Sequence, residues 1–249
     1  MLDHLFLFIV ALISNIFSAF SGGGAGVIQL PAILFIFNSS FVSALAVHKI
    51  ATVALGIGAS SGFLKSADYN RNFIINCLIL GLPFVILGTK FVLSINEELS
   101  RFLLGVLIIL ISIYSIIDRK FGEYNENVHI PKKKIYIGYI LICIVAFLNG
   151  SLSAGTGLIF TLILSVIFKM SIKNSIMYTL LIVGLFYNLI GAITIGVFSV
   201  IDWTMLPSLL LGSLIGGYLG AKLSIQKSNK TIKFAYQIVT LIVGINLLI

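Results

Sequence analysis

The run Ser21-Gly22-Gly23-Gly24-Ala25-Gly26 interrupts one apolar stretch of the chain, and Ser153-Ala154-Gly155-Thr156-Gly157 interrupts another. We call residues 21–26 the first break and residues 153–157 the second break. The two breaks lie 131 residues apart, as measured from Gly24 to Gly155. Matched interruptions in the two halves of a membrane chain are typical of transporters built by duplication, whose substrate site lies at the broken helices. The breaks therefore predict a duplicated transporter.

The composition predicts a helical membrane protein. Of the 249 residues, 59% are hydrophobic and 10% are charged, and the mean hydropathy is +1.15, as is typical of polytopic membrane proteins. The net charge of +8 comes from basic residues in short loops, where they set orientation, so no nucleic-acid partner is expected. Cys77 and Cys143 fall in apolar runs without a CxxC or His/Cys cluster, so we expect no disulfide, metal or cofactor. Asp3, the absence of Lys and Arg nearby, and the lack of a small-residue cleavage pattern argue against a cleaved signal peptide.

Ten apolar segments follow one another and divide into two sets of five. In each set the first two segments are short. At 1.5 Å per residue, residues 5–20 make about 24 Å of helix and residues 25–37 about 20 Å, against a hydrocarbon core of about 30 Å. Each short pair is therefore either one broken helix that crosses once or a hairpin that returns to the side it entered. The ten segments are 5–20, 25–37, 41–64, 73–91, 102–117, 135–148, 157–168, 176–200, 203–223 and 232–249.

The loop charges favour the hairpin. With single crossings, the Lys and Arg residues of the loops divide seven against eight between the two sides, which gives no orientation. With hairpins, thirteen lie on one side and only Lys90 and Arg101 on the other, a bias that marks the cytoplasmic side. We therefore expect a protein of the cell (inner) membrane with both termini outside the cytoplasm. The thirteen are Lys65, Arg71, Arg119, Lys120, Lys132, Lys133, Lys134, Lys169, Lys173, Lys222, Lys227, Lys230 and Lys233.

The predicted fold is an all-α polytopic membrane protein made of two inverted repeats, each a broken-helix hairpin plus three transmembrane helices. The match of Leu87-Gly88-Thr89-Lys90 with Leu219-Gly220-Ala221-Lys222, at an offset of 132, supports the duplication. The first repeat, residues 1–118, contains the hairpin 5–37 and the helices 41–64, 73–91 and 102–117. Residues 119–134 form a polar cytoplasmic linker. The second repeat, residues 135–249, contains the hairpin 135–168 and the helices 176–200, 203–223 and 232–249.

The residues of the breaks are the first candidates for substrate binding. They are Gly22, Gly23, Gly24 and Gly26 in the first break and Gly155, Thr156 and Gly157 in the second. Their backbone N–H groups are uncovered where the second half-helix of each hairpin begins, and a helix N-terminus binds anions through such groups and its positive dipole end. The competing explanation is close helix packing, which also uses small residues. Two matched breaks favour binding, because packing alone does not require interrupted helices.

Three polar residues in apolar segments complete the predicted site. Lys49 lies inside the segment 41–64, and a cation there is costly enough to indicate a function, here as counter-charge to an anion; the alternative is a lysine that snorkels to the interface. His48 is either a hydrogen-bond donor or proton carrier, or a packed neutral histidine. Asn149 precedes the second break and either lines the cavity or bonds between helices. The same choice applies to Ser18, Gln29, Tyr187 and Asn188.

A set of motifs follows in a fixed order along the chain. They are Gly22-Gly23-Gly24-Ala25-Gly26, Leu30-Pro31, Ala44 to Lys49, Leu87-Gly88, Gly150, Gly155-Thr156-Gly157 and Gly212 to Lys222. In this order and spacing the chain resembles the TauE/SafE family of sulfite exporters and related permeases over nearly its whole length. The resemblance implies a permease that moves small sulfur-containing anions, such as sulfite, sulfoacetate and other organosulfonates, across the inner membrane.

Some positions depart from the family pattern. Many relatives carry an Asn-Lys pair inside the second segment; Lys49 matches the Lys, and His48 replaces the Asn. Several relatives carry an Asp shortly before each break, where this chain has Ser18 and Asn149. A second Lys found in some relatives has Leu181 or its neighbours in its place. These differences leave the identity of the substrate, and any proton coupling through those acids, open.

The leading hypothesis is a secondary transporter, working as an exporter, that holds a small sulfur-containing anion between the two glycine-rich tips near the membrane midplane. The alternatives are a permease for another small organic anion such as a carboxylate, and a non-transporting membrane assembly factor. An enzyme is not expected, because the histidines lack obvious partners and the eight acids fall outside the spans. The expected partners are the anion, the lipid bilayer, a coupling ion (H⁺ or Na⁺) and a second copy of the chain.

Overall fold

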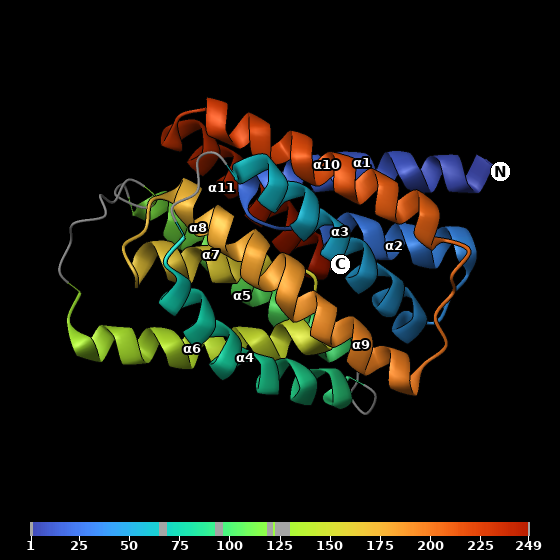
Figure 1. The fold of residues 1–249 in the computed structure, drawn as a ribbon, viewed down its shortest axis with the longest axis horizontal. Coiled ribbons are helices and arrows are strands. Elements are labelled where there is room, and N and C mark those ends of the chain that lie inside the picture. The colour runs from blue at the N-terminus through green and yellow to red at the C-terminus, as the bar shows by residue number, and fades with distance from the viewer. Residues whose placement is uncertain (1, 65–68, 93–96, 119–121, 123–129, 249) are drawn as a thin grey trace.

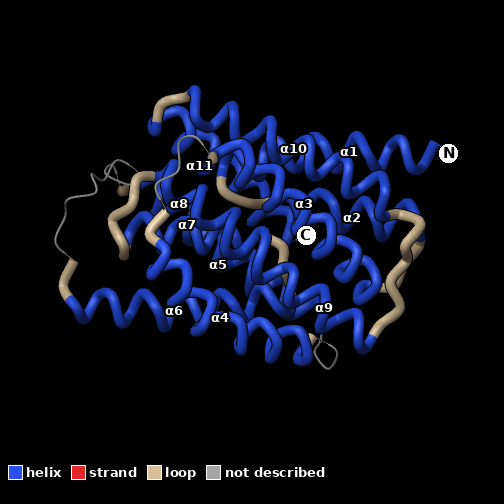
Figure 2. The backbone as a smooth tube through the Cα atoms, viewed as in Figure 1, coloured by secondary structure: helices blue, strands red, loops and turns tan. Residues whose placement is uncertain are grey.

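The computed structural model describes residues 2–64, 69–92, 97–118, 122 and 130–248. Over these residues the chain is helical and contains no strand (Figure 2), which confirms the predicted all-α class. Six stretches of helix within them are long and apolar enough to cross a membrane, so the chain is a multi-pass membrane protein. The elements are α1 (Leu2–Ser21), α2 (Ala25–Phe37), α3 (Phe41–Phe63), α4 (Arg71–Phe91), α5 (Glu97–Ile117), α6 (Lys132–Ser151), α7 (Thr156–Val166), α8 (Ile172–Thr179), the π-helix η1 (Leu180–Tyr187), α9 (Asn188–Phe198), α10 (Leu206–Gln226) and α11 (Asn229–Leu248).

The helices lie close to the ten predicted segments, but several bounds differ. The predicted segment 176–200 corresponds to α8, η1 and α9, and α5 and α10 differ from the predicted 102–117 and 203–223 by up to five residues at an end. α1 and α6 are each 20 residues long, about 30 Å at 1.5 Å per residue, so they are longer than the predicted first arms of the hairpins. Hydropathy excludes Asp3 and the lysines 132–134, yet an acid suits a helix N-terminus and exposed lysines can extend into the headgroups. The second arms stay short, with 13 residues in α2 and 11 in α7. Most of the predicted linker 119–134 lies outside the described residues, and α6 already begins at Lys132.

The chain reverses direction at each break. Figure 1 shows α2 running back alongside α1, and α7 running back toward the end of the molecule at which α6 begins. α1 packs against α2, and α6 packs against α7. A single helix that crossed once would have continued in the same direction. That these hairpins belong to two inverted repeats stays a prediction.

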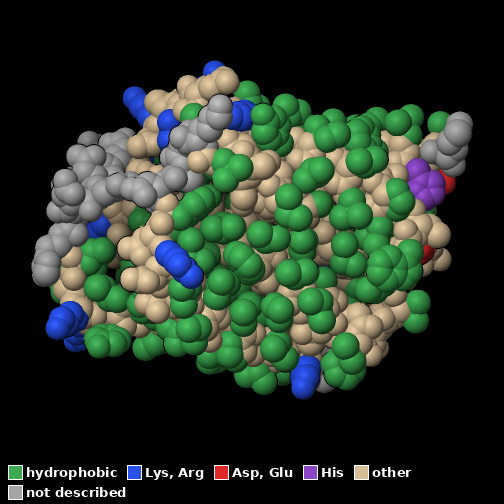
Figure 3. All heavy atoms as spheres, in the orientation of Figure 1, with side chains coloured by type: hydrophobic (Ala, Val, Ile, Leu, Met, Phe, Trp, Pro, Cys, Tyr) green, Lys and Arg blue, Asp and Glu red, His purple; other side chains and the backbone are tan. Residues whose placement is uncertain are grey.

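The two ends of the molecule differ in charge. The N-terminus, the α2–α3 turn and the α9–α10 connection lie at one end (Figure 1). On the face drawn in Figure 3, most Lys and Arg side chains gather toward the opposite end, and hydrophobic side chains cover the region between. A bilayer-embedded protein with one basic end has this distribution. Which end faces the cytoplasm stays a prediction.

Glycines let α10 approach α1 until their backbones touch. Gly212 and Gly216, four residues apart, face α1, as the small-xxx-small pattern of membrane helix pairs predicts. An added Cβ would lie 2.7 Å from the Phe8 carbonyl oxygen at Gly212 and 2.6 Å from the Leu12 carbonyl oxygen at Gly216. Any larger residue would separate the helices.

Contacts of a glycine with a backbone carbonyl oxygen occur at corresponding positions in the two halves of the chain. Gly220 of α10 lies against the carbonyl oxygen of Ile16 in α1, and Gly88 of α4 lies against that of Phe147 in α6. The two glycines are 132 residues apart and the two carbonyls 131 apart. Each hairpin therefore packs on a helix of the other half at a corresponding position, so the two halves interlock.

Candidate functional site

Both breaks use backbone conformations that favour glycine. Gly22, Gly23 and Gly24 have φ values of 96°, 149° and 101°, and Gly155 has 76°. Residues with a Cβ rarely adopt these angles, which explains why each reversal is glycine-rich. Ser153 adopts φ 61° without being glycine, a strained conformation of the kind found at functional sites.

The two breaks touch each other through their backbones. A Cβ added at Gly23 would lie 2.8 Å from the backbone nitrogen of Leu158, and one at Gly26 would lie 3.1 Å from the Cα of Ala154. The Thr161 hydroxyl donates a hydrogen bond to the carbonyl oxygen of Gly22 at 3.1 Å. The first break is therefore packed against the start of α7, and the second against the start of α2.

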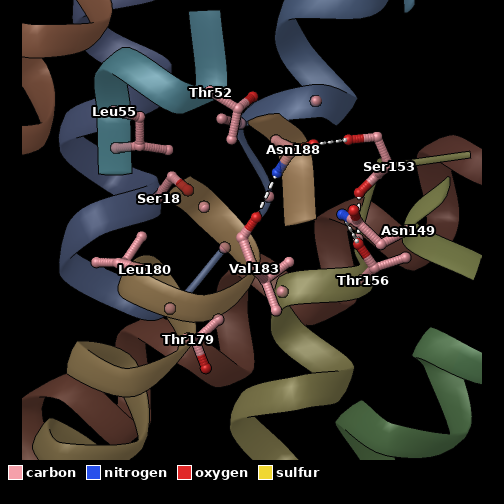
Figure 4. Close-up of a pocket in the computed structure, with 18 of the residues that line it drawn as sticks. Ser18, Thr52, Leu55, Asn149, Ser153, Thr156, Thr179, Leu180, Val183 and Asn188 are labelled. Carbon is pink, nitrogen blue, oxygen red and sulfur yellow. Dashed lines mark hydrogen bonds between the residues drawn. The ribbon is translucent and has the colours of Figure 1, made fainter. Parts of the chain in front are cut away.

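A cavity of about 40 Å³ lies where the breaks meet (Figure 4). Since one water occupies about 10–15 Å³ of such a volume, the cavity has room for roughly three waters or one small oxyanion. It takes lining residues from both halves of the chain. They are Ser18, Gly22, Gly23, Gly24, Ala25, Gly26, His48, Thr52, Leu55, Asn149, Ser153, Gly155, Thr156, Gly157, Thr179, Leu180, Val183, Gly184 and Asn188.

Unpaired backbone donors line this cavity. Ala25 and Gly26 at the start of α2 and Gly157 at the start of α7 line the cavity, and within the described part of the chain their backbone N–H groups make no hydrogen bond. Each N–H belongs to the first turn of its helix, which carries the positive end of the dipole. The cavity thus presents donors and positive potential from two helices.

His48 connects the cavity to a buried polar chain on α1 and α2. Its Nδ1 lies 2.8 Å from Gln29 Oε1, and Gln29 Nε2 donates to the Ser14 hydroxyl at 3.2 Å. Because the amide oxygen of Gln29 accepts, the network assigns the proton to Nδ1 of the neutral imidazole. A Cβ at Gly26 would lie 2.8 Å from Nε2, so the other ring nitrogen faces the first break.

Lys49 is fully buried but does not line the cavity. Its Nζ donates to the backbone carbonyl oxygen of Asn149 at 2.5 Å, close to the C-terminal end of α6. A cation stabilises the carbonyl end of a helix. Lys49 therefore lies one residue away from the cavity and contacts it through Asn149.

Asn149 begins a second hydrogen-bonded network, which Figure 4 shows. Its Nδ2 donates to the Thr156 hydroxyl at 3.1 Å, and that hydroxyl donates to the carbonyl oxygen of Ser153 at 2.7 Å. The Ser153 hydroxyl donates to Asn188 Oδ1 at 3.1 Å, and Asn188 Nδ2 donates to the carbonyl oxygen of Val183 at 2.7 Å. The second break is thus tied to the π-helix η1, an element that is rare and frequently found at functional sites.

The structure gathers nine of the ten predicted site residues around one cavity, and Lys49 lies next to them. Ser18 and Asn188, which the sequence indicated as cavity-lining polar groups, also line it. Gln29 does not line it but bonds to His48, which does, and Tyr187 bonds to the carbonyl oxygen of Cys77. Sequence reasoning missed the hydroxyls of Thr52 and Thr179. Thr52 follows His48 by four residues, so helical periodicity gave a usable signal.

The chemistry of this site is that of binding. Among the described residues no three His, Cys, Asp or Glu side chains cluster as metal ligands would. The groups at the cavity are N–H donors, hydroxyls, two amides and one imidazole. Their arrangement suits a small anion enclosed by backbone donors.

Comparison with known proteins gives the family. The model of the family described as "Sulfite exporter TauE/SafE" matches residues 7–247. A Haemophilus influenzae "Probable membrane transporter protein" is 25% identical over 230 residues, covering 91% of this chain and 87% of the relative. YfcA of Escherichia coli K12 is 23% identical over 247 residues (97% and 88%), and YunE of Bacillus subtilis is 20% identical over 270 residues (99% and 98%); both are named probable membrane transporter proteins. No solved structure matches the chain. Because the family model spans nearly the whole sequence, this protein belongs to the TauE/SafE family and is a membrane transporter, not an enzyme.

Proposed function

We propose that this protein is a secondary transporter, working as an exporter, of small sulfur-containing anions such as sulfite or organosulfonates. The observation that carries the proposal is the cavity between the two breaks, lined by unpaired N–H groups at the start of α2 and of α7. Helix N-termini bind anions through such groups, and transporters built from broken helices hold their substrates there.

The binding residues in this proposal are those that the sequence indicated. They are Gly22, Gly23, Gly24, Gly26, His48, Lys49, Asn149, Gly155, Thr156 and Gly157. Lys49 acts indirectly. Its ammonium group bonds to the carbonyl oxygen of Asn149 and adds positive potential beside the cavity. The glycines expose the N–H groups, and Asn149 and Thr156 hold the second break in place.

Transport follows if the two halves rock against each other and open the cavity to one side at a time. The halves are residues 1–118 and 135–249, related as inverted repeats. The protein lies in the cell membrane with both termini outside the cytoplasm, uses H⁺ or Na⁺ as coupling ion and assembles as a homodimer. A permease for carboxylates would use the same donors, so the experiment below includes them.

Purified protein in detergent tests the proposal by thermal-shift screening. We expect sulfite, thiosulfate or sulfoacetate to raise the Tm. We also expect proteoliposomes that contain the protein to transport the anion that raises the Tm most. The Gly26→Ala variant should lose both the rise in Tm and the flux, because the new Cβ would lie 2.8 Å from His48 Nε2. Gly196→Ala, whose Cβ would meet only a side-chain atom of Ile201 at 3.2 Å, is the matched control. Stabilisation by carboxylates alone would change the substrate class, and no response to any small anion would refute the proposal of an anionic substrate.

Two single-cysteine variants test the orientation, in a background without Cys77 and Cys143. Thr204 and Lys227 are exposed and lie on connections at opposite ends of the molecule. In intact cells a membrane-impermeant thiol reagent should label Thr204→Cys and leave Lys227→Cys unlabelled. The reverse pattern would contradict the proposed orientation.

A further inference from the structure

One acceptor atom in the cavity wall has no partner. Asn149 is 1% exposed and lines the cavity, yet its Oδ1 has no hydrogen-bond partner among the described residues. Buried side-chain oxygens are nearly always paired, and leaving one unpaired is costly. An unpaired acceptor in the wall of a binding cavity indicates that the ligand supplies the donor.

The hydrogen-bond network fixes which end of this amide is unpaired. The Thr156 hydroxyl donates its only proton to the carbonyl oxygen of Ser153 at 2.7 Å. Toward Asn149 it can therefore only accept, so Nδ2 must face it, as the 3.1 Å contact shows. The flipped amide would set two acceptors against each other. Oδ1 is thus the atom left without a partner.

The cavity therefore combines donors for an anion with an acceptor for a proton. Ala25, Gly26 and Gly157 contribute N–H groups, and Asn149 contributes Oδ1. His48 Nε2, an acceptor in the assigned tautomer, also lies at the cavity, 3.4 Å from the Thr52 hydroxyl. An oxyanion without a proton would place one of its own oxygens against Oδ1, which repels it. An oxyanion that keeps an acidic O–H donates this proton to Oδ1 and accepts from the N–H groups with its other oxygens, so every group is paired.

The charge at the site favours the same ligand. Each helix N-terminus contributes about +0.5 elementary charge, so α2 and α7 together balance about one negative charge. Among the described residues no Lys or Arg lines the cavity, and the ammonium group of Lys49 already bonds to the Asn149 carbonyl oxygen. A dianion would keep about one uncompensated charge in a buried site, which is costly.

We propose that the cavity selects monoanionic oxyanions that retain an acidic proton, hydrogen sulfite rather than sulfite, and that Asn149 Oδ1 recognises this proton. The inference rests on the proposed function and narrows it to hydrogen sulfite, because organosulfonates and thiosulfate carry no acidic proton at neutral pH. It also names the residue that recognises the proton. Two titratable groups face this region, His48 at the cavity and Lys49 behind Asn149. For that reason the test compares ligands at a single pH.

Hydrogen carbonate and nitrate form a matched pair of probes. Both are planar monoanions of similar size, and only hydrogen carbonate carries an O–H. We expect purified protein to bind hydrogen carbonate roughly tenfold more tightly than nitrate, the value of about one hydrogen bond to a charged group. Nitrate is the more weakly hydrated of the two, so desolvation opposes the expected order. Nitrate binding as tight as hydrogen carbonate binding would overturn the proposal.

Asn149→Ala should bring the two affinities within about twofold of each other. Asn15→Ala is the control, because Asn15 is an equally buried amide with an unpaired Oδ1 that does not line the cavity; it should keep the preference. A preference that survives Asn149→Ala would remove Asn149 from the recognition, and if this variant does not fold the wild-type comparison decides. Binding of sulfite without discrimination between the probes would refute this inference alone. Absence of binding by every oxyanion, hydrogen sulfite included, would refute the proposed function too.

Discussion

Replacing Gly23 with alanine tests the contact between the two breaks. Gly23 has φ 149°, and an added Cβ would lie 2.8 Å from the backbone nitrogen of Leu158. Backbone strain at such a position costs about 1–3 kcal/mol, and forcing an extra carbon into a packed site costs about 1–3 kcal/mol. The obstructing atoms belong to the backbone, so a side-chain rotation does not relieve the overlap. We expect the free energy of unfolding to fall by about 2–6 kcal/mol.

Thermal unfolding in detergent measures this loss. For a chain of this size each kcal/mol shifts the Tm by about 2–4 °C, so Gly23→Ala should lower it by at least about 4 °C. Gly196→Ala is the matched control, because Gly196 is exposed on α9 and alanine is favoured over glycine inside a helix by up to about 1 kcal/mol. Its Tm should stay the same or rise. Equal values for the two variants would refute the backbone contact.

Three further predictions concern single residues. Lys49→Ala removes the ammonium group that bonds to Asn149, so sulfite flux in proteoliposomes should fall to background. Gly216→Ala places a Cβ 2.6 Å from the carbonyl oxygen of Leu12, so the free energy of unfolding should fall by about 1–3 kcal/mol in thermal denaturation. Burial, and then the adjacent Tyr178, raises the pKa of Tyr69 to about 12. Its contribution to stability should be complete below the unfolded value of about 10 and be lost as the pH rises toward 12; Tyr69→Phe should abolish this part of the alkaline loss.

Each of these three predictions would be contradicted by a specific result. Unchanged flux in Lys49→Ala would remove Lys49 from the site. A Gly216→Ala protein as stable as Gly196→Ala would show that α1 and α10 do not touch through their backbones. The Tyr69 hydroxyl has no hydrogen-bond partner among the described residues, so Tyr69→Phe should be no less stable than wild type at neutral pH. A clear loss of stability there would mean that the hydroxyl is paired.

The sequence predicted the helices well because they depend on local patterns. The same patterns indicated residues that the structure places around one cavity, and their role in binding stays a prediction. Apolar runs give helices in a membrane chain, and glycines at 22–24 and at 155 adopt angles that other residues avoid. The lengths of α1 and α6 were less predictable. Hydropathy treats Asp3 and Lys132 as the edge of a segment, although the backbone of a charged residue remains helical when its side chain reaches water.

Some features of the site depend on tertiary contacts and therefore could not be predicted from the sequence. The position of Lys49 inside a span indicated a counter-charge facing the substrate, yet its Nζ reaches the end of α6, 100 positions later in the chain. The π-helix at 180–187 has no pattern of its own, because its residues are apolar as in any buried helix. The Oδ1 atom of Asn149 is unpaired because the Thr156 hydroxyl donates its proton to the carbonyl oxygen of Ser153. None of these follows from spacing along the chain.

The contact between the two breaks ties membrane insertion of the first half to synthesis of the second. The start of α2 leaves backbone N–H groups without hydrogen bonds, and Ala154, which packs against Gly26, comes 128 positions later in the chain. Until the second break is made, these groups would face lipid, where each unpaired group costs several kcal/mol. In the proposed topology, the nascent first hairpin would therefore remain at the aqueous border or against the insertion machinery until the second break is made.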